Sequence, residues 1–553
     1  RATSALFLAC LWIGGCRHDP AADPMPPSNE TLDAGSTDGS MPPSSNLPQA
    51  KDGWWRSAVF YEIFVRSFKD SDGDGVGDFA GLTQMLDYLN DGDPATTNDL
   101  GVDALWLMPI QASPSYHGYD VTDYKAVNTD YGDIADFDRL IEEAHSRGIK
   151  VIIDFVLNHS SSQHPWFRQS RSPNSKFRDY YTWRDEPDAR WRRPWDGANV
   201  WHSSPTGYYY GIFWSGMPDL NLANPEVEAH MIDAMRFWLD RGVDGFRVDA
   251  VRYLMQTEDG KLADIPQTHD FAKNVRQQLA DYPDAVWVAE AWTDVSRVAD
   301  YYGDNGNEFS LAFSFDVAGA IKSSINDGNR ANLNQTLELS DRFMPDRGFE
   351  APFLSNHDMQ RVMREIGGNT AAMRVAAALL MAMPGTPFLY YGEEIGMQGG
   401  ASSRDEDKRT PMRWTAQGPG FGFTTADRPW HPGQEADGIS VAAQRNQPDS
   451  LWSLYRDLIA LRHEHAALAD GDSSRPAITD GDRGVLAILR TVGEQRVLVL
   501  ANVHRDAAGP FTVAIDGTPS ILMQEGLQGE VTVQNDQLRI DGLAGRGFAF
   551  IRL

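Results

Sequence analysis

The feature of this sequence that most constrains its fold is an alternation of short apolar runs with amphipathic stretches between residues 54 and 466. The apolar runs predict buried strands, and the amphipathic stretches predict helices that cover them. One such stretch, 224–242, opens with Asn-Pro and closes at a glycine, as helices often do. Eight repeats of a strand followed by a helix predict a (β/α)₈ or TIM barrel. The predicted strands are 59–68, 102–110, 150–159, 245–253, 285–292, 311–316, 351–358 and 387–397.

Two regions depart from this alternation. Residues 160–220 are too many for an ordinary loop between a strand and a helix, and they are rich in Trp and Tyr. We interpret them as a small subdomain inserted after the third strand, whose aromatic side chains mainly form its own core. Residues 467–553 alternate apolar and polar side chains between turns, which predicts a C-terminal antiparallel β-sandwich. The barrel is then expected in two parts, 51–159 and 221–466.

The N-terminal residues predict export. Residues 1–16 combine a short apolar run with IGGC, which is similar to a bacterial lipobox, so we expect a signal peptide and a lipid on Cys16. An ordinary cleaved signal is the alternative. Residues 17–50 are rich in Pro, Ser, Gly and Asp and predict a disordered tether. We expect a periplasmic or cell-surface lipoprotein of a Gram-negative bacterium that meets the membrane only through this anchor.

Charge and cysteine content narrow the classes of function. Asp and Glu outnumber Lys and Arg by 78 to 49, and the net charge of −29 repels nucleic acid phosphates. We therefore expect a neutral substrate and no nucleic acid partner. We also expect a monomer. Both cysteines, Cys10 and Cys16, lie in the signal segment, so we expect no disulfide in the mature body.

Polar side chains stand at the ends of several predicted strands, which is where a (β/α)₈ barrel carries its site. Burying such polar groups costs free energy unless they have hydrogen-bond or ionic partners, so their presence indicates either such partners or a function. Any one of them could be structural, as Asp154 would be if it only paired with Arg247. Carboxylates that meet from different strands suit glycosyl transfer, which needs an ionised nucleophile and a protonated acid. The residues concerned are Asp154, Asn158, His159, Arg247, Asp249, Glu290, Asn356, His357 and Asp358.

The segments around these residues resemble a known family. DFVLNH, GFRVDAVRY, VWVAEAW and FLSNHD, in this order, resemble the catalytic regions of the α-amylase family, glycoside hydrolase family 13, and GVDALWLMP and GTPFLYYGEEIGM resemble two further regions. The resemblance runs from about residue 54 to the chain end. It implies that Asp249 is the nucleophile, Glu290 the general acid and base, and Asp358 the carboxylate that binds the reacting sugar. It also implies a subsite lined by Tyr119, His159, Arg247 and His357.

The resemblance further implies a double displacement with retention. Asp249 would attack the anomeric carbon while Glu290 protonates the leaving oxygen, and water would then release the covalent intermediate with Glu290 as base. The charge of Arg247 would keep Asp249 ionised.

A separate motif, DSDGDGVGD at residues 70–78, places carboxylates at alternate positions with glycines between them. The spacing follows the start of an EF-hand loop, although Gly81 takes the place of its closing Glu. Similar loops bind Ca²⁺ in family members related to oligo-1,6-glucosidase, so the resemblance implies a structural calcium site. A solvated acidic turn is the alternative. The expected ligands are Asp70, Asp72, Asp74, the carbonyl of Val76, and Asp78.

Three features bear on the substrate. Exo-acting α-glucosidases of the family carry an Asp three residues before the counterpart of Tyr119, and here that position is Tyr116, which indicates an open cleft. Ala250 stands where oligo-1,6-glucosidases tend to have Val, which favours α-1,4 bonds. The stretch MPDLN at 217–221 resembles the subfamily intermediate between oligo-1,6-glucosidases and neopullulanases, which includes exported α-amylases. We therefore expect an endo-acting α-amylase on starch, glycogen or maltooligosaccharides.

Other functions stay open at this point. An α-glucosidase, a cyclomaltodextrinase or a 4-α-glucanotransferase would share the same catalytic residues. A glucan-binding lipoprotein without catalysis is a more distant alternative, since binding alone does not need a protonated acid beside a nucleophile. The sequence also leaves open whether Asn158 contributes to a second Ca²⁺ site, as its counterpart does in many α-amylases.

Overall fold

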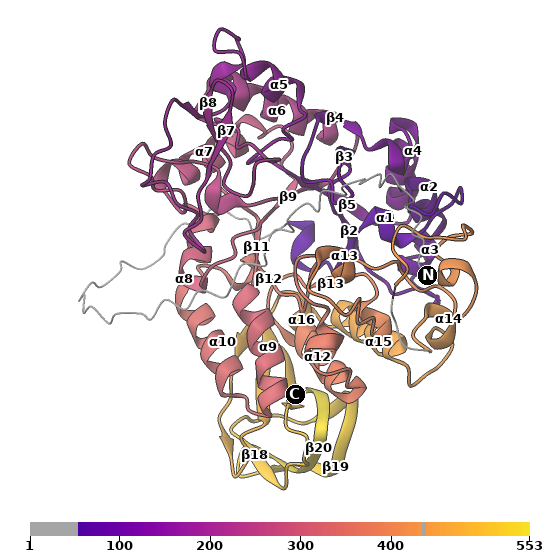
Figure 1. The fold of residues 1–553 in the computed structure, drawn as a ribbon. Coiled ribbons are helices and arrows are strands. Elements are labelled where there is room, and N and C mark those ends of the chain that lie inside the picture. The colour runs from indigo at the N-terminus through magenta and orange to yellow at the C-terminus, as the bar shows by residue number, and fades with distance from the viewer. Residues whose placement is uncertain (1–52, 434–437) are drawn as a thin grey trace, which may run out of the picture.

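The computed structural model describes residues 53–433 and 438–553. The predicted signal segment 1–16 with Cys16 and the predicted tether 17–50 lie outside the described residues. Figure 1 shows a central barrel, a small inserted sheet at one end of the molecule and a yellow C-terminal β-domain at the other. In the described part of the chain, no helix combines the length and the apolar character needed to cross a membrane.

Eight strands form the barrel, in the hydrogen-bonded order β12-β11-β10-β9-β5-β2-β1-β13. All neighbours along this order are parallel, and a parallel bridge between Phe353, after β12, and Phe388 of β13 closes the ring. The predicted TIM barrel is thus confirmed. Its strands are β1 (Phe60–Ile63), β2 (Ala104–Leu107), β5 (Lys150–Phe155), β9 (Gly245–Val248), β10 (Val286–Ala289), β11 (Leu311–Phe313), β12 (Glu350–Ala351) and β13 (Phe388–Tyr390).

The predicted strands were too long at their carboxyl ends. After Ile63 the chain forms the short helix α1 (Val65–Phe68), and after β9 it forms a 3₁₀ turn over Val251–Tyr253. Both segments are largely buried, and an apolar run alone does not distinguish a buried strand from a buried helical turn. The chain therefore leaves the sheet earlier than the apolar runs indicated.

Helices surround the barrel, and α4 shows how the sequence specifies them. Asp133 and Asp136 form a capping box at its start, and its apolar face is buried. The helices are α1, α2 (Phe79–Gln84), α3 (Leu86–Leu89), α4 (Ile134–Ser146), α6 (Pro225–Leu239), α7 (Pro266–Gln278), α8 (Val295–Val298), α9 (Phe315–Asp327), α10 (Ala331–Phe343), α11 (Val362–Glu365), α12 (Thr370–Ala382), α13 (Asp405–Lys408), α14 (Val441–Gln444), α15 (Leu451–Glu464) and α16 (Ala466–Asp470).

Inside the barrel, side-chain chemistry changes along the strands. Phe60 and Ile152 belong to an apolar cluster within the ring. Side chains two positions apart on a strand point to the same side, so Glu62 and Asp154 also point into the barrel, one step closer to the carboxyl ends of their strands. Arg247 on β9 is in register with Asp154 on β5. The interior is thus apolar at the start of the strands and charged toward their carboxyl ends.

Residues 160–220 contain α5 (Pro165–Ser170) and a three-stranded antiparallel sheet in the order β6-β8-β7. Its strands are β6 (Trp183–Arg184), β7 (Trp201–Ser204) and β8 (Gly207–Tyr210). Trp191, Trp201 and Tyr210 are each at most 2 % exposed and pack together. These aromatic residues form a core of this region, as predicted for most of them. A second small hairpin, β3 (Gln111–Ala112) and β4 (Asp123–Val127), lies between β2 and α4.

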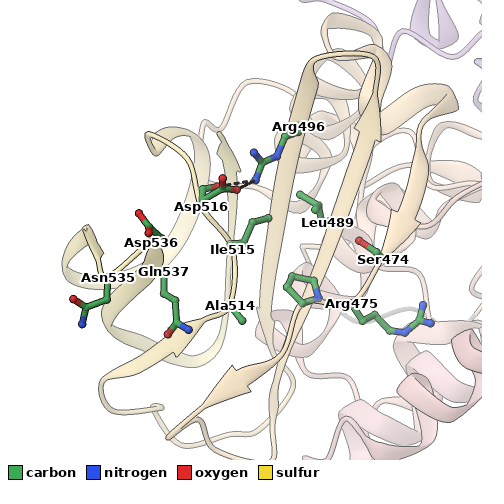
Figure 2. A pocket seen from close by; sticks show the side chains of 11 residues that line it. Ser474, Arg475, Leu489, Arg496, Ala514, Ile515, Asp516, Asn535, Asp536 and Gln537 are labelled. Carbon is green, nitrogen blue, oxygen red and sulfur yellow. Dashed lines mark hydrogen bonds and ion pairs between the residues drawn. The ribbon is translucent and has the colours of Figure 1, made fainter.

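The C-terminal region is antiparallel throughout. Strand β20 pairs with β17 near its end and with β18 near its start, and side chains from both halves meet in one buried cluster. An open cavity of about 810 Å³ lies in this domain, lined partly by Arg475, Arg496 and Asp516 (Figure 2). The strands are β14 (Asp472–Ser474), β15 (Ile478–Thr479), β16 (Val485–Val492), β17 (Gln495–Asn502), β18 (Phe511–Val513), β19 (Ser520–Gln534) and β20 (Gln537–Arg552).

Candidate active site

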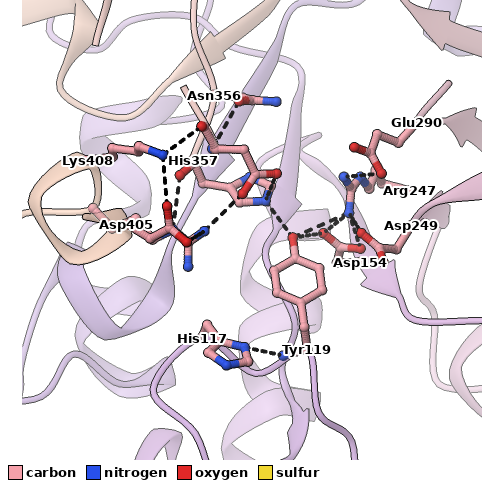
Figure 3. Close-up of polar contacts among 12 residues, drawn as sticks. His117, Tyr119, Asp154, Arg247, Asp249, Glu290, Asn356, His357, Asp405 and Lys408 are labelled. Atoms are coloured by element: carbon pink, nitrogen blue, oxygen red, sulfur yellow. Dashed lines mark hydrogen bonds and ion pairs between the residues drawn. The ribbon is translucent and has the colours of Figure 1, made fainter. Parts of the chain in front are cut away.

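Arg247 is the centre of the candidate site. Its side chain is fully buried, and its Nη1 donates to both carboxylate oxygens of Asp154 at 2.8 and 2.9 Å and to Oδ1 of Asp249 at 2.8 Å. Its Nη2 lies 3.2 Å from Oε2 of Glu290. One guanidinium therefore gathers carboxylates from the ends of β5, β9 and β10, as Figure 3 shows. The structure thus brings Asp249 and Glu290 together, as predicted.

The turn after β9 connects two of these carboxylates through the main chain. Asp249 directly follows β9, and Ala250 has φ of 51° and ψ of 39°, a left-handed conformation that is uncommon without glycine. In this conformation the main-chain N–H of Ala250 donates to Oε2 of Glu290 at 2.8 Å. The backbone beside Asp249 thus holds the side chain of Glu290 in place.

The protonation of Glu290 follows from its surroundings. Burial raises the pKa of Glu290 to about 8; the charge of Arg247 lowers it in part, while Asp249 and Asp358 raise it further. Glu290 therefore carries a proton at neutral pH. Burial also raises the pKa of Asp154 to about 6 against the opposing charge of Arg247. The site thus combines a protonated carboxyl group with an ion-paired Asp249.

Asp358 and His357 lie in the segment that follows β12. Nε2 of His357 is 3.1 Å from Oδ2 of Asp358, and Nη2 of Arg409 donates to Oδ1 of Asp358 at 2.9 Å. Burial opposes ionisation of Asp358, but His357 and Arg409 outweigh it and lower the pKa of Asp358. Burial likewise opposes a charge on His357, yet Asp358 and Glu62 raise the pKa of His357 to about 9. Asp358 is therefore ionised across the neutral range.

Tyr119 and His159 complete the predicted subsite. The ring of Tyr119 stacks on His357 at 5.6 Å and 19°, and its hydroxyl donates to Oδ2 of Asp154 at 2.9 Å. His159 is 2 % exposed and lies near enough to Asp249 for that charge to act on its pKa, but burial dominates and lowers the pKa of His159 to about 4. Among the described residues, Nε2 of His159 has no hydrogen-bond partner. This neutral imidazole can bind a sugar hydroxyl.

Sequence reasoning missed three residues of this site. Glu62 contacts His357, Arg409 contacts Asp358, and Nζ of Lys408 donates to the carbonyl of Asp358 at 2.9 Å. Glu62 could have been identified from the sequence, since it is a carboxylate inside the apolar run FYEI. Lys408 and Arg409 could not have been identified in this way, because they lie after the last barrel strand and reach the site only through the tertiary fold.

The acidic loop at residues 70–78 lies before α2. One carboxylate oxygen of each of Asp70, Asp72 and Asp78 lies within 4.8 Å of the other two. Asp74 falls outside this group, and its Oδ1 accepts from the main-chain N–H of Val76 at 2.7 Å. Closely spaced carboxylate oxygens repel one another, and a hard divalent cation relieves that repulsion. The residues present therefore fit Ca²⁺, with Asp70, Asp72 and Asp78 as the best-placed ligands.

Comparison with known proteins agrees with this geometry. The family profile described as "Alpha amylase, catalytic domain" matches residues 62–471. Alpha-amylase 3 of Dictyoglomus thermophilum is 38 % identical over 458 residues, which cover 82 % of this chain and 86 % of that protein. Trehalose synthase/amylase TreS of Mycolicibacterium smegmatis is 36 % identical over 493 residues, covering 80 % and 81 % of the two chains.

A solved structure is similar over nearly the same length. The α-amylase from H. orenii superposes with a TM-score of 0.79 at 40 % sequence identity, covering 90 % of this chain and 99 % of that one. Both the barrel and the sequence regions around its carboxyl ends therefore have counterparts in known enzymes. The chain belongs to the α-amylase family, glycoside hydrolase family 13, and is a glycoside hydrolase of that family.

Proposed function

We propose that this chain is an endo-acting α-amylase that hydrolyses α-1,4-glucosidic bonds of starch, glycogen or maltooligosaccharides with retention of configuration. The observation that carries the proposal is the arrangement of Asp249 and Glu290 on one guanidinium, the first ion-paired with Arg247 and the second protonated at neutral pH. A retaining glycosidase needs a nucleophilic carboxylate and a protonated acid close together.

The proposed reaction has two steps. Oδ1 of Asp249 is engaged by Arg247, so we assign the attack on the anomeric carbon to Oδ2. Glu290 gives its proton to the departing glycosidic oxygen, and a glycosyl ester forms on Asp249. A water molecule then attacks the ester, Glu290 takes its proton, and Asp249 leaves as a carboxylate.

The other residues bind and orient the reacting sugar. Asp358, kept ionised by His357 and Arg409, offers an anionic acceptor for sugar hydroxyls. Tyr119 presents an aromatic face at the same rim, and aromatic faces pack well against the apolar face of a sugar ring. These contacts support distortion of the ring toward the transition state.

Tyr116 supports endo action. Its ring stacks on Trp430 at 5.6 Å and 23°, and the guanidinium of Arg409 lies 5.9 Å from its centroid. The family's exo-acting enzymes use an Asp at this position to close the site on a terminal sugar. An aromatic surface can instead support a glucan chain that continues past the reacting residue.

A product analysis tests the proposal. Maltoheptaose and a maltooligosaccharide blocked at its non-reducing end are each incubated with the enzyme, and early products are followed by chromatography and by NMR of the anomeric protons. We expect internal cleavage of both substrates and products that first appear in the α configuration. Asp249→Asn serves as the control for contaminating activity.

The same experiment separates the alternatives. Glucose released only from the free-ended substrate indicates an α-glucosidase, and products longer than the substrate indicate a 4-α-glucanotransferase. Faster turnover of a cyclodextrin than of maltoheptaose indicates a cyclomaltodextrinase. Formation of trehalose would indicate a trehalose synthase, the activity in the name of TreS, rather than the proposed hydrolase. No turnover of any of these would leave a glucan-binding protein and refute hydrolysis.

We also propose a structural Ca²⁺ ion on the loop at residues 70–78. Support comes from the grouping of Asp70, Asp72 and Asp78, with Asp74 and the carbonyl of Val76 as additional predicted ligands. The ion would stabilise the loop ahead of α2 and take no part in the reaction. EDTA should lower the melting temperature, and Ca²⁺ in excess should restore it. An unchanged melting temperature in EDTA would refute the site, and Asp72→Asn should reduce the EDTA effect.

Finally, we propose that the protein is exported and anchored by a lipid on Cys16. The support is the lipobox-like IGGC followed by a tether-like composition. Labelled palmitate should be incorporated into the full-length chain during expression in a Gram-negative host, and Cys16→Ala should abolish incorporation. Secretion of the unlabelled wild-type chain would indicate an ordinary cleaved signal.

A further inference from the structure

We propose that Glu62 is a positioning residue that keeps His357 doubly protonated and thereby fixes the contact between His357 and Asp358. Glu62 lies on β1 inside the barrel and is 2 % exposed. It was not among the residues expected in the site. The inference rests on the proposed hydrolysis and adds a residue that acts on the sugar only through His357.

The contacts of Glu62 place a proton on one nitrogen of His357. Oε1 of Glu62 lies 2.6 Å from Nδ1 of His357 and accepts from the main-chain N–H of His357 at 3.3 Å. Burial raises the pKa of Glu62, and the charge and the hydrogen bond of His357 oppose that effect by stabilising the ionised carboxylate. An ionised carboxylate can only accept, so Nδ1 must donate and therefore carries a hydrogen.

The other nitrogen of His357 also has acceptors around it. Nε2 lies 2.6 Å from the hydroxyl oxygen of Tyr119 and 3.1 Å from Oδ2 of Asp358. The hydroxyl of Tyr119 donates its hydrogen to Asp154, so its oxygen is left to accept. Asp358 is a carboxylate and also accepts. Nε2 must therefore donate as well, and His357 is an imidazolium between two carboxylates.

The charges around His357 explain why the removal of Glu62 matters. Glu62 is the charged partner on the Nδ1 side, and Asp358 is the charged partner on the Nε2 side. Burial lowers the pKa of His357, and the charges of these two carboxylates raise it. The groups that face His357 from the surrounding elements are Glu62, Tyr119, Asp154, Arg247, Asp358 and Arg409.

Without the charge of Glu62, His357 would lose its second proton at a lower pH. A neutral His357 would attract Asp358 less strongly, and the carboxylate that binds the reacting sugar would be less firmly held. The defect should therefore grow as the pH rises. A purely structural role for Glu62 would instead reduce activity by the same factor at every pH.

The test is Glu62→Gln, which keeps the shape of the side chain but removes its charge. Relative to wild type, kcat on maltoheptaose should be within about threefold near pH 5 and should fall by about tenfold or more near pH 8, with a smaller change in KM. A matched control is Glu308→Gln, because Glu308 is a buried carboxylate that contacts Nδ1 of His269 at 2.8 Å outside the site. The control should show no such pH-dependent loss.

A measurement without substrate separates failure of this inference from failure of the proposed function. Nitrogen-15 NMR of labelled histidines, assigned with His357→Gln, should show His357 doubly protonated at neutral pH in the wild type and titrating at lower pH in Glu62→Gln. A constant activity ratio across pH would overturn the inference. A neutral His357 in the wild type at pH 7 would overturn it even if the variant fails to fold. Wild-type inactivity on glucans would overturn the hydrolysis alone.

Discussion

Asp249 is the residue on which the proposed chemistry most directly depends. We expect Asp249→Asn to fold, since its carboxylate is near the rim and 8 % of the residue is exposed, and to bind maltooligosaccharide. Without a nucleophile, kcat should fall by about 10⁴-fold or more. Hydrolysis rates and calorimetric binding measure the two effects. Asp233→Asn, on the exposed side of α6, is the control, and near-normal turnover of Asp249→Asn would contradict the assignment.

The proton on Glu290 predicts the alkaline limit of activity. Burial raises the pKa of Glu290 to about 8, so the acid is protonated below this pH and ionised above it. Because only the protonated form can act as the acid, kcat/KM should stay constant as the pH rises toward about 8 and should then fall by about tenfold per pH unit. A pH–rate profile on maltoheptaose measures this limb. If the same limb persisted in the residual activity of Glu290→Gln, another group would have to be responsible.

At the scale of elements, Arg252 joins two loops of the site. Its Nη1 donates to the carbonyl of Trp292 at 2.6 Å, and its Nε donates to Oδ1 of Asp264 at 3.0 Å. Trp292 comes two residues after Glu290, so Arg252 holds the loop after β10 against the turn after β9. Arg252 is thus placed to set the position of Glu290, the proposed acid, from outside the group of carboxylates on Arg247.

We expect Arg252→Ala to destabilise the fold by about 1–3 kcal/mol, because it leaves a carbonyl without its donor and removes a charged partner from the partly buried Asp264. It should also lower kcat by about tenfold, since the loop of Glu290 loses its alignment. Thermal melts and steady-state kinetics measure these effects. Arg241→Ala removes a comparable contact, to Asp138, on the outer helices and should leave kcat unchanged. A loss of stability with normal kcat in Arg252→Ala would show that the loop keeps its position unaided.

The elements also show what the sequence could and could not predict. The barrel was predictable because its strands are apolar runs between amphipathic helices, and the meeting of Asp249 with Glu290 follows from the rule that such strands end at one rim. The limits of the strands were not predictable, since Val65–Phe68 directly follows the strand region and is buried like a strand, but forms a helical turn. The contact of Arg409 with Asp358 was not predictable either, because 51 positions separate the two residues.

At the scale of the whole molecule, a buried arginine connects the barrel to the C-terminal domain. Arg490 of β16 donates from Nη1 to the carbonyls of Ala382 and Met383 at 3.0 and 2.7 Å. Arg462 of α15 donates to the carbonyl of Met381 at 3.1 Å. These carbonyls stand at the end of α12, where the helix dipole favours a cation. The C-terminal domain therefore supplies part of the structure that ends a barrel helix.

Arg490→Leu should destabilise the protein by about 3 kcal/mol, because buried carbonyls lose a charged donor. Since the contact spans the barrel and the β-domain, we also expect one calorimetric transition in the wild type and a broadened or split transition in the variant. Arg539→Leu, which replaces a partly exposed arginine on β20, is the control. A melting temperature equal to that of the wild type would show that the two domains are held together by other contacts.

The bridge between Phe353 and Phe388 that closes the ring has a kinetic consequence. Glu62, Asp154 and Arg247 come from β1, β5 and β9, and Asp358 comes from the segment that reaches β13 only when this seam forms. A partly assembled barrel, however rich in secondary structure, has the proposed nucleophile without the carboxylate that is proposed to bind the sugar. Activity regained on refolding should thus lag behind helical content, so that turnover reports the last event of assembly rather than its progress.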